Sequence, residues 1–171
     1  MLAIAFFIQS GHFAEHVVQI IQIYAQGIPG PQAHGLLGSV FDFEWVHFVY
    51  NITLEIVLLA LCLGYYVLQR RKSLPLITDL MPMLIGLVAF QGYHAIEHIT
   101  KLYQYLFIPL HQSGAVPTPG ILPTLTGWPI PLVHFWINLI VWVLMMLVVW
   151  RLHMTFWVPE FAAHPKRIQP T

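Results

Sequence analysis

Residues 9–19 read QSGHFAEHVVQ, and residues 91–101, 82 positions later, read QGYHAIEHITK. Both stretches match the pattern Q-x-x-H-x-x-E-H, and both lie inside long apolar segments. In the first copy the polar side chains recur with spacings of 3, 4 and 3, which places them on one face of a helix; they are Gln9, His12, His16 and Gln19. Ionisable side chains inside a membrane-spanning segment are costly and are therefore functional by default. The two stretches thus predict where the protein has its functional site.

The composition around these stretches is that of an integral membrane protein. The chain has 171 residues, of which 58% are hydrophobic and 8% are charged, whereas soluble domains have about 25% charged residues. The formal net charge is zero and there is no basic patch, so we expect no nucleic-acid partner. A single cysteine, Cys62, excludes an internal disulfide and a cysteine-based metal cage. The lipid bilayer is the partner that this composition predicts.

Four apolar segments are long enough to span a bilayer, which requires roughly 20 helical residues. They run approximately over Leu2–Gln26, Val40–Leu68, Leu80–Phe107 and Pro129–Phe156. The predicted fold class is an all-α integral membrane protein, a bundle of four transmembrane helices. The first segment lacks a basic region and a cleavage site, so we expect a retained span and not a signal peptide. Ser39 with Asp42 is expected to cap the second helix, and Asp79 the third.

A second matched motif indicates an internal duplication. Residues 45–51 read WVHFVYN and residues 132–138 read LVHFWIN, so that H-F-x-x-N occurs twice, 87 positions apart. Two motifs repeated in the same order predict two tandem two-span repeats, residues 1–72 and 73–157, followed by a polar C-terminal tail, residues 158–171. Because each repeat has two spans, both repeats should have the same orientation in the membrane, as parallel repeats do.

The basic residues predict the topology. They follow the second and fourth segments, at Arg70, Arg71, Lys72, Arg151, Lys166 and Arg167. The positive-inside rule makes that side cytoplasmic and places the N- and C-termini there. Aromatic residues at the interfaces are expected at Tyr24, Trp45, Tyr105 and Trp128 on the outer side, and at Tyr65, Tyr66, Trp150 and Trp157 on the inner side. The histidine motifs then fall between the midplane and the outer leaflet.

The first hypothesis for the site is a transition-metal centre. Imidazole and carboxylate groups together favour iron, copper or zinc, and two histidines at positions i and i+4 of one helix can share an ion. The preferred ligands are His12, His16, His94 and His98. The next candidates are His47, His134 and Glu44, and Glu15 and Glu97 could bridge two metals or accept hydrogen bonds from ligating histidines.

Further polar residues are expected to hydrogen-bond to the ligands; these are Asn51, Asn138, Glu55, Gln19 and Lys101. Lys101 occupies the position of Gln19 in the second repeat and could pair with Glu44 or Glu97, so the two halves are not equivalent. The number of ligands suffices for two metals. With open coordination positions, such a centre would suit a metal-dependent membrane oxidoreductase acting on a small lipophilic substrate.

Two alternatives remain open on the sequence. The first is a haem b or quinone electron-transfer subunit, with the haem iron held by His16 and His98, or by His12 and His94, at equal depth. The second is a non-catalytic small subunit of a larger membrane complex, in which the histidines and glutamates form a hydrogen-bonded network or a proton pathway. The sequence does not distinguish an enzyme from a binding protein.

Overall fold

The computed structural model describes residues 2–38, 43–71, 79–112 and 116–156. Within these ranges the chain is all-α. The four long helices are α1 (Leu2–Tyr24), α3 (Glu44–Arg70), α4 (Leu80–Phe107) and α7 (Ile130–Phe156). The connections contain three short helices, η1 (Gly30–Gln32), α5 (Pro109–Gln112) and α6 (Leu122–Thr126). The prediction of a bundle of four long helices is confirmed.

The helix boundaries agree closely with the sequence pattern, with one local exception. The predicted cap of the second helix, Ser39 with Asp42, lies outside the described residues. Asp79 directly precedes α4, but its side chain makes no capping hydrogen bond, so this prediction is wrong. Its two carboxylate oxygens instead accept hydrogen bonds from Arg151 Nε, at 3.0 and 2.8 Å. A charged guanidinium is a stronger donor than a backbone N–H, and the contact joins the start of α4 to α7.

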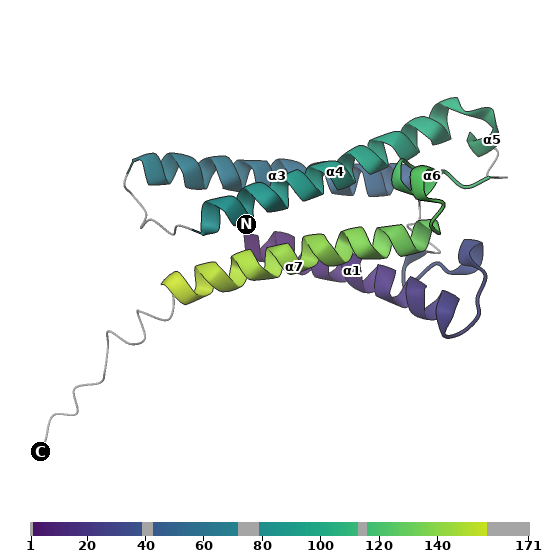
Figure 1. The fold of residues 1–171 in the computed structure, drawn as a ribbon, viewed down its shortest axis with the longest axis horizontal. Helices are drawn as coiled ribbons and strands as arrows, with labels where there is room; N and C mark the ends of the chain where they lie inside the picture. The colour runs from purple at the N-terminus through teal and green to yellow at the C-terminus, as the bar shows by residue number, and fades with distance from the viewer. Residues whose placement is uncertain (1, 39–42, 72–78, 113–115, 157–171) are drawn as a thin grey trace, which may run out of the picture.

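The four helices form two layers, and each layer combines a helix of one repeat with a helix of the other. Figure 1 shows α3 beside α4 in one layer and α1 beside α7 in the other, and these are also the two pairs in closest contact. The two helices of the first repeat, α1 and α3, have few contacts with each other. The two repeats are therefore interlocked, and neither buries its interior alone.

Buried amide pairs hold each layer together. In one layer Gln9 Nε2 donates to Asn138 Oδ1 at 3.0 Å, and in the other Gln91 Nε2 donates to Asn51 Oδ1 at 3.0 Å. All four side chains are completely buried. Each asparagine also donates to the carbonyl of the histidine one turn earlier, at 2.9 Å. This second bond orients the amide, so that its oxygen faces the glutamine of the neighbouring helix.

The interior changes from apolar to polar along the bundle axis. On α4 the buried stripe begins with Leu80, Leu84 and Leu87 and continues with Gln91, His94, His98 and Lys101. The apolar half packs against Leu54, Leu58, Val141, Met145 and Val148 of the adjacent helices. The polar half is the one nearer the short helices α5 and α6. A single helical face thus contributes both to the hydrophobic core and to the candidate site.

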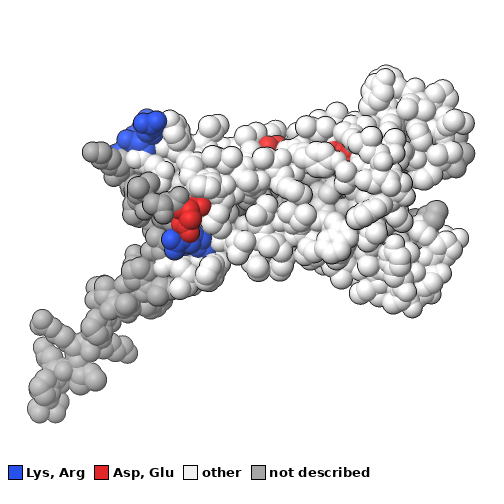
Figure 2. Space-filling model, viewed as in Figure 1, with Lys and Arg blue, Asp and Glu red and all other residues white. Residues whose placement is uncertain are grey.

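The outside of the bundle is largely apolar. Two of the helices, α3 and α7, are long and apolar enough to cross a membrane. In α1 and α4 the stripe of polar side chains lowers the mean hydropathy of a stretch of the same length. On the face shown in Figure 2, the lysine and arginine side chains gather at the end where α3 ends and α4 begins. The remainder of that face has only isolated charges.

Replacing Gln9 with leucine should destabilise the bundle. The substitution leaves Asn138 Oδ1 without its donor and removes the acceptor of the Tyr50 hydroxyl, which lies 2.6 Å from Gln9 Oε1. A buried polar group without a partner costs about 1–3 kcal/mol, so Gln9→Leu should lower the free energy of unfolding by roughly 2–4 kcal/mol. Denaturant titration in detergent, followed by circular dichroism, measures this. The exposed Gln26→Leu is the control, and equal losses for both variants would contradict the role of the amide pair.

Candidate metal centre

Six histidines from all four long helices meet in the polar half of the bundle. They are His12 and His16 of α1, His47 of α3, His94 and His98 of α4, and His134 of α7. The centroids of neighbouring rings lie between 4.8 and 6.5 Å apart. The structure therefore brings together every histidine that the sequence predicts as a ligand.

The closest contacts are between histidines one turn apart on the same helix. The Nε2 atoms of His12 and His16 lie 3.3 Å apart, and those of His94 and His98 lie 3.1 Å apart. Two nitrogens bound to one ion at about 2.1 Å, with tetrahedral to octahedral angles, lie roughly 3.0–3.4 Å apart. Both pairs have this separation. The same distance also fits a hydrogen bond between a protonated and an unprotonated ring nitrogen.

The histidines of the second repeat form a group that could hold a metal ion. The ligand atoms of His94, His98 and His134 all lie within 4.8 Å of one another, and all three residues are buried. His134 Nε2 is buried and has no hydrogen-bond partner. A buried polar atom without a partner requires an explanation, and a metal ion would provide one. Three imidazole ligands suit zinc, copper or iron.

In the first repeat the third histidine lies farther from the pair. Among the described residues, only His94, His98 and His134 have ligand atoms close enough together to share one ion, and the ring of His47 lies as near to that of His98, at 5.6 Å, as to that of His12. The ring of His47 lies 5.6 Å from that of His12 and 6.5 Å from that of His16. His16 Nδ1 lies 2.9 Å from Gln19 Oε1, so the side chain of Gln19 orients the ring and leaves Nε2 directed at His12. A hydrogen bond to the second ring nitrogen is the usual way in which proteins position a ligating histidine.

The two glutamates of the H-x-x-E-H motifs bind loop backbone. Glu15 accepts hydrogen bonds from the N–H groups of Leu37 and Gly38, at 2.8 and 2.9 Å. Glu97 accepts from the N–H groups of residues 121 and 122, at 2.7 and 2.8 Å. Each glutamate directly precedes a histidine, so it points about 100° away from the histidine face. The contacts of both carboxylates support loop anchoring, while the two roles expected from the sequence, bridging two metals or accepting a hydrogen bond from a ligating histidine, stay predictions.

Two glycines and two glutamines complete these loop anchors, and the sequence analysis did not identify them. Gly35 and Gly120 have φ values of +72° and +81°, which favour glycine. Gln22 binds the backbone of Gly35, and Gln104 accepts from the N–H of Gly120. The signal was present, because Gln22 and Gln104 have the same 82-residue offset as the histidine motifs. The offset alone does not show that these glutamines bind a loop, because that depends on where each loop returns to its helix.

A buried ion pair breaks the symmetry between the repeats. Lys101 Nζ lies 3.1 Å from Glu44 Oε1, one of the two pairings left open by the sequence. The hydroxyl of Thr118 also donates to Glu44, whereas the second carboxylate oxygen is buried without a hydrogen-bond partner. By the repeat offsets, the corresponding positions are Gln19 and Pro131. The pair borders a cavity of about 420 Å³ whose wall includes His16, His47, His98 and His134.

The remaining predicted residues are near the cluster but do not contact its rings. Asn51 and Asn138 bind backbone carbonyls and the buried glutamines. Glu55 lies two helical turns from His47, about 12 Å along the helix. A Cβ added at Gly92 would lie 3.4 Å from Glu55 Oε1, which places this carboxylate beside α4 next to Gly92.

Comparison with known proteins adds no assignment. No family model matches the chain, and neither a curated protein nor a solved structure matches it.

Replacing Gly35 with alanine should disrupt the first loop anchor. The added Cβ would lie 2.3 Å from Glu15 Oε1, so the carboxylate would have to leave the two loop N–H groups. Gly27→Ala is a matched control, because its φ is also positive, at +69°, and nothing lies within 4 Å of the added Cβ. Both variants have the cost of a left-handed residue, about 1–2 kcal/mol.

Gly35→Ala should lose about 1 kcal/mol more than the control, since one exposed and one partly buried N–H group lose their carboxylate acceptor. Thermal unfolding in detergent gives the comparison. Equal melting temperatures for the two variants would show that the contact between Glu15 and the loop does not stabilise the fold.

Proposed function

We propose that the protein is an integral membrane protein that binds two transition-metal ions in the six-histidine cluster, one for each repeat. The observation that supports this most directly is the repeated pair of Nε2 atoms, 3.3 Å apart in His12 and His16 and 3.1 Å apart in His94 and His98. A third histidine from a neighbouring helix lies beside each pair. Iron, copper and zinc are the metals that such an imidazole set favours.

The coordination would be incomplete, which supports chemistry at the metal. Three histidines for each ion leave at least one position for water or substrate, as in catalytic metal sites. The cavity of about 420 Å³ reaches histidines of both repeats, so a small molecule has space beside the centre. With iron or copper, the site would support electron transfer to O₂ or to an organic substrate, and the protein would be an oxidoreductase.

The exposed side chains support a location in the membrane. Large apolar residues are exposed along all four long helices; examples are Phe7, Ile56, Leu63, Ile85, Ile96 and Trp136. Soluble monomers rarely expose an apolar surface of this extent. Exposed aromatic residues occur near both ends, at Tyr24, Trp45, Tyr105 and Trp128 and at Tyr66 and Trp150. Tyr65 differs from the prediction because it is buried, and Trp157 lies outside the described residues.

The depth and orientation of the site follow from the same proposal. His47 and His134 lie in the first turns of α3 and α7, near the end of the bundle whose connections contain no lysine or arginine. Arg70, Arg71 and Arg151 lie near the opposite end, which the positive-inside rule assigns to the cytoplasm. The metal centre would then lie between the midplane and the outer leaflet.

Of the alternatives, a haem fits the cluster less well. The macrocycle would have to enter between rings whose centroids are 4.8 to 6.5 Å apart. A bis-histidine iron would also use only two of the six imidazoles. A purely structural network is consistent with the hydrogen-bond distances, and metal analysis separates it from the proposal.

Metal content is the decisive measurement. Elemental analysis of protein purified without chelator, or reconstituted with metal, should give two equivalents of iron, copper or zinc. His94→Ala with His98→Ala should reduce this to one equivalent, as should His12→Ala with His16→Ala, while the exposed His34→Ala should retain two. A folded wild-type protein that binds no metal after reconstitution would contradict the proposal and favour the hydrogen-bonded network.

A further inference from the structure

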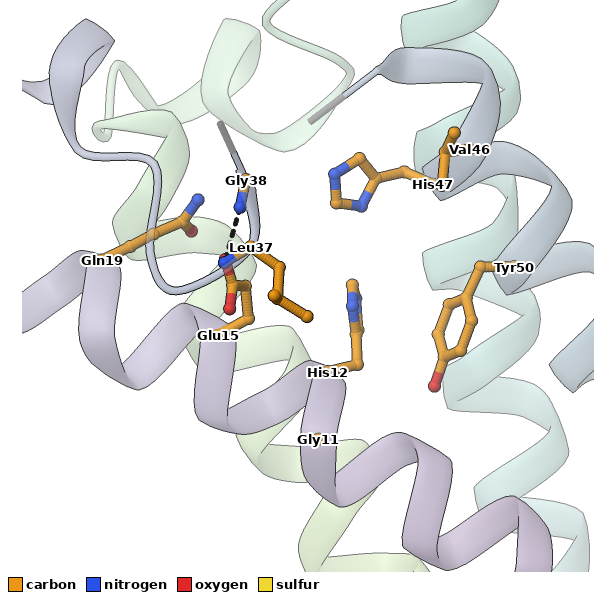
Figure 3. Close-up of a pocket in the computed structure, with 9 residues that line it drawn as sticks. All are labelled: Gly11, His12, Glu15, Gln19, Leu37, Gly38, Val46, His47 and Tyr50. Carbon is orange, nitrogen blue, oxygen red and sulfur yellow. Dashed lines mark hydrogen bonds between the residues drawn. The ribbon is translucent and has the colours of Figure 1, made fainter. Parts of the chain in front are cut away.

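A second cavity reaches the histidine cluster from the side of the bundle. It has a volume of about 190 Å³ and lies between α1 and α3, beside Gly11, His12, Val46, His47 and Tyr50. In Figure 3 the rings of His12 and His47 face the same open space from α1 and α3, and Tyr50 borders it on the α3 side. The cavity touches histidines of the first repeat alone.

The second repeat differs at the corresponding positions. The 82-residue offset places Tyr93, with a buried hydroxyl, where the first repeat has Gly11. The helices α4 and α7 also pack together more closely than their counterparts α1 and α3. His94 and His134 are at most 5% exposed, whereas His12 is only half-buried. The lateral opening is thus a feature of one repeat.

The walls of the lateral cavity favour an uncharged occupant. Its one carboxylate, Glu15, already accepts two backbone hydrogen bonds from the loop. The Tyr50 hydroxyl donates to a buried glutamine. Ile8, three residues before Gly11, and Val49, directly before Tyr50, are about half exposed and belong to the apolar exterior. An apolar cavity of roughly 150 Å³ holds one benzene ring, so this one suits a molecule of about that size.

We propose that this cavity binds a small uncharged molecule, about the size of one aromatic ring, that enters from the lipid between α1 and α3. The molecule places a nitrogen or oxygen donor atom on the metal held by His12, His16 and His47. The inference rests on the proposed metal centre and specifies its substrate class. It gives the metal of the first repeat an access from the lipid, whereas His98 and His134 of the second repeat border the cavity of about 420 Å³.

Cobalt-loaded protein provides a direct test, with 4-methylpyridine as the probe. Ligation changes the visible spectrum of the cobalt ion, and the titration gives an affinity. Gly11→Leu should fill the cavity and weaken binding at least tenfold, while the cobalt content stays at two equivalents. A Cβ at Gly11 meets nothing within 4 Å, so the substitution is sterically tolerated. Gly86→Leu is the matched control, since this exposed helical glycine also has nothing within 4 Å.

The two proposals fail in different ways in this experiment. Wild-type protein that binds no cobalt contradicts the metal centre. Full cobalt loading with equal 4-methylpyridine affinities for Gly11→Leu and Gly86→Leu overturns the lateral site alone.

A second measurement needs no metal. Gly11→Cys, combined with Cys62→Ala, places the single thiol of the protein beside the cavity. The thiol is labelled in vesicles by an uncharged, lipid-soluble maleimide and by a permanently charged thiosulfonate, and each rate is divided by the rate of the same reagent with a free thiol in water. The relative rate of the maleimide should be at least ten times that of the thiosulfonate. Equal relative rates would show that the cavity opens to water and would overturn access from the lipid.

Discussion

The structure depends on one constraint, that polar side chains buried between apolar helices must find partners inside the bundle. Each long helix of the chain has a stripe of amides or imidazoles on its inner face, and the most extensive helix contacts, α3 with α4 and α1 with α7, each join one repeat to the other. Gln9 reaches Asn138 and Gln91 reaches Asn51, so each amide pair joins one repeat to the other. These bonds explain why the duplicated halves interlock and why the six histidines meet at one place.

The duplication creates two similar half-sites, and a few substitutions make them different. Lys101 and Glu44 form an ion pair with no counterpart in the other repeat. Gly11 borders a lateral cavity, whereas its counterpart is Tyr93. The asymmetric residues are therefore the ones from which the chemistry of the site can be inferred.

Most of the candidate site could be predicted from the sequence because helical periodicity places residues on a face. The spacing of His94 and His98 implies adjacent imidazoles, and the structure has their Nε2 atoms 3.1 Å apart. The same periodicity could not assign a role to Glu15 or Glu97. The angle of about 100° between successive residues of a helix shows that these carboxylates point away from the histidines. It does not show that a loop packs against them. Asp79 was misassigned for a similar reason, since its partner Arg151 lies 72 positions away.

The sequence by itself determined the bundle of four long helices and the identity of the clustered histidines, since these follow from composition and from spacings within single helices. Tertiary structure alone decided which helices pair and which repeat has the lateral cavity. It also decided which carboxylates bind loops and which one pairs with Lys101. Those outcomes depend on contacts between residues distant in sequence. Such contacts are set by how side chains from several helices fill a shared interior, and no local pattern encodes that.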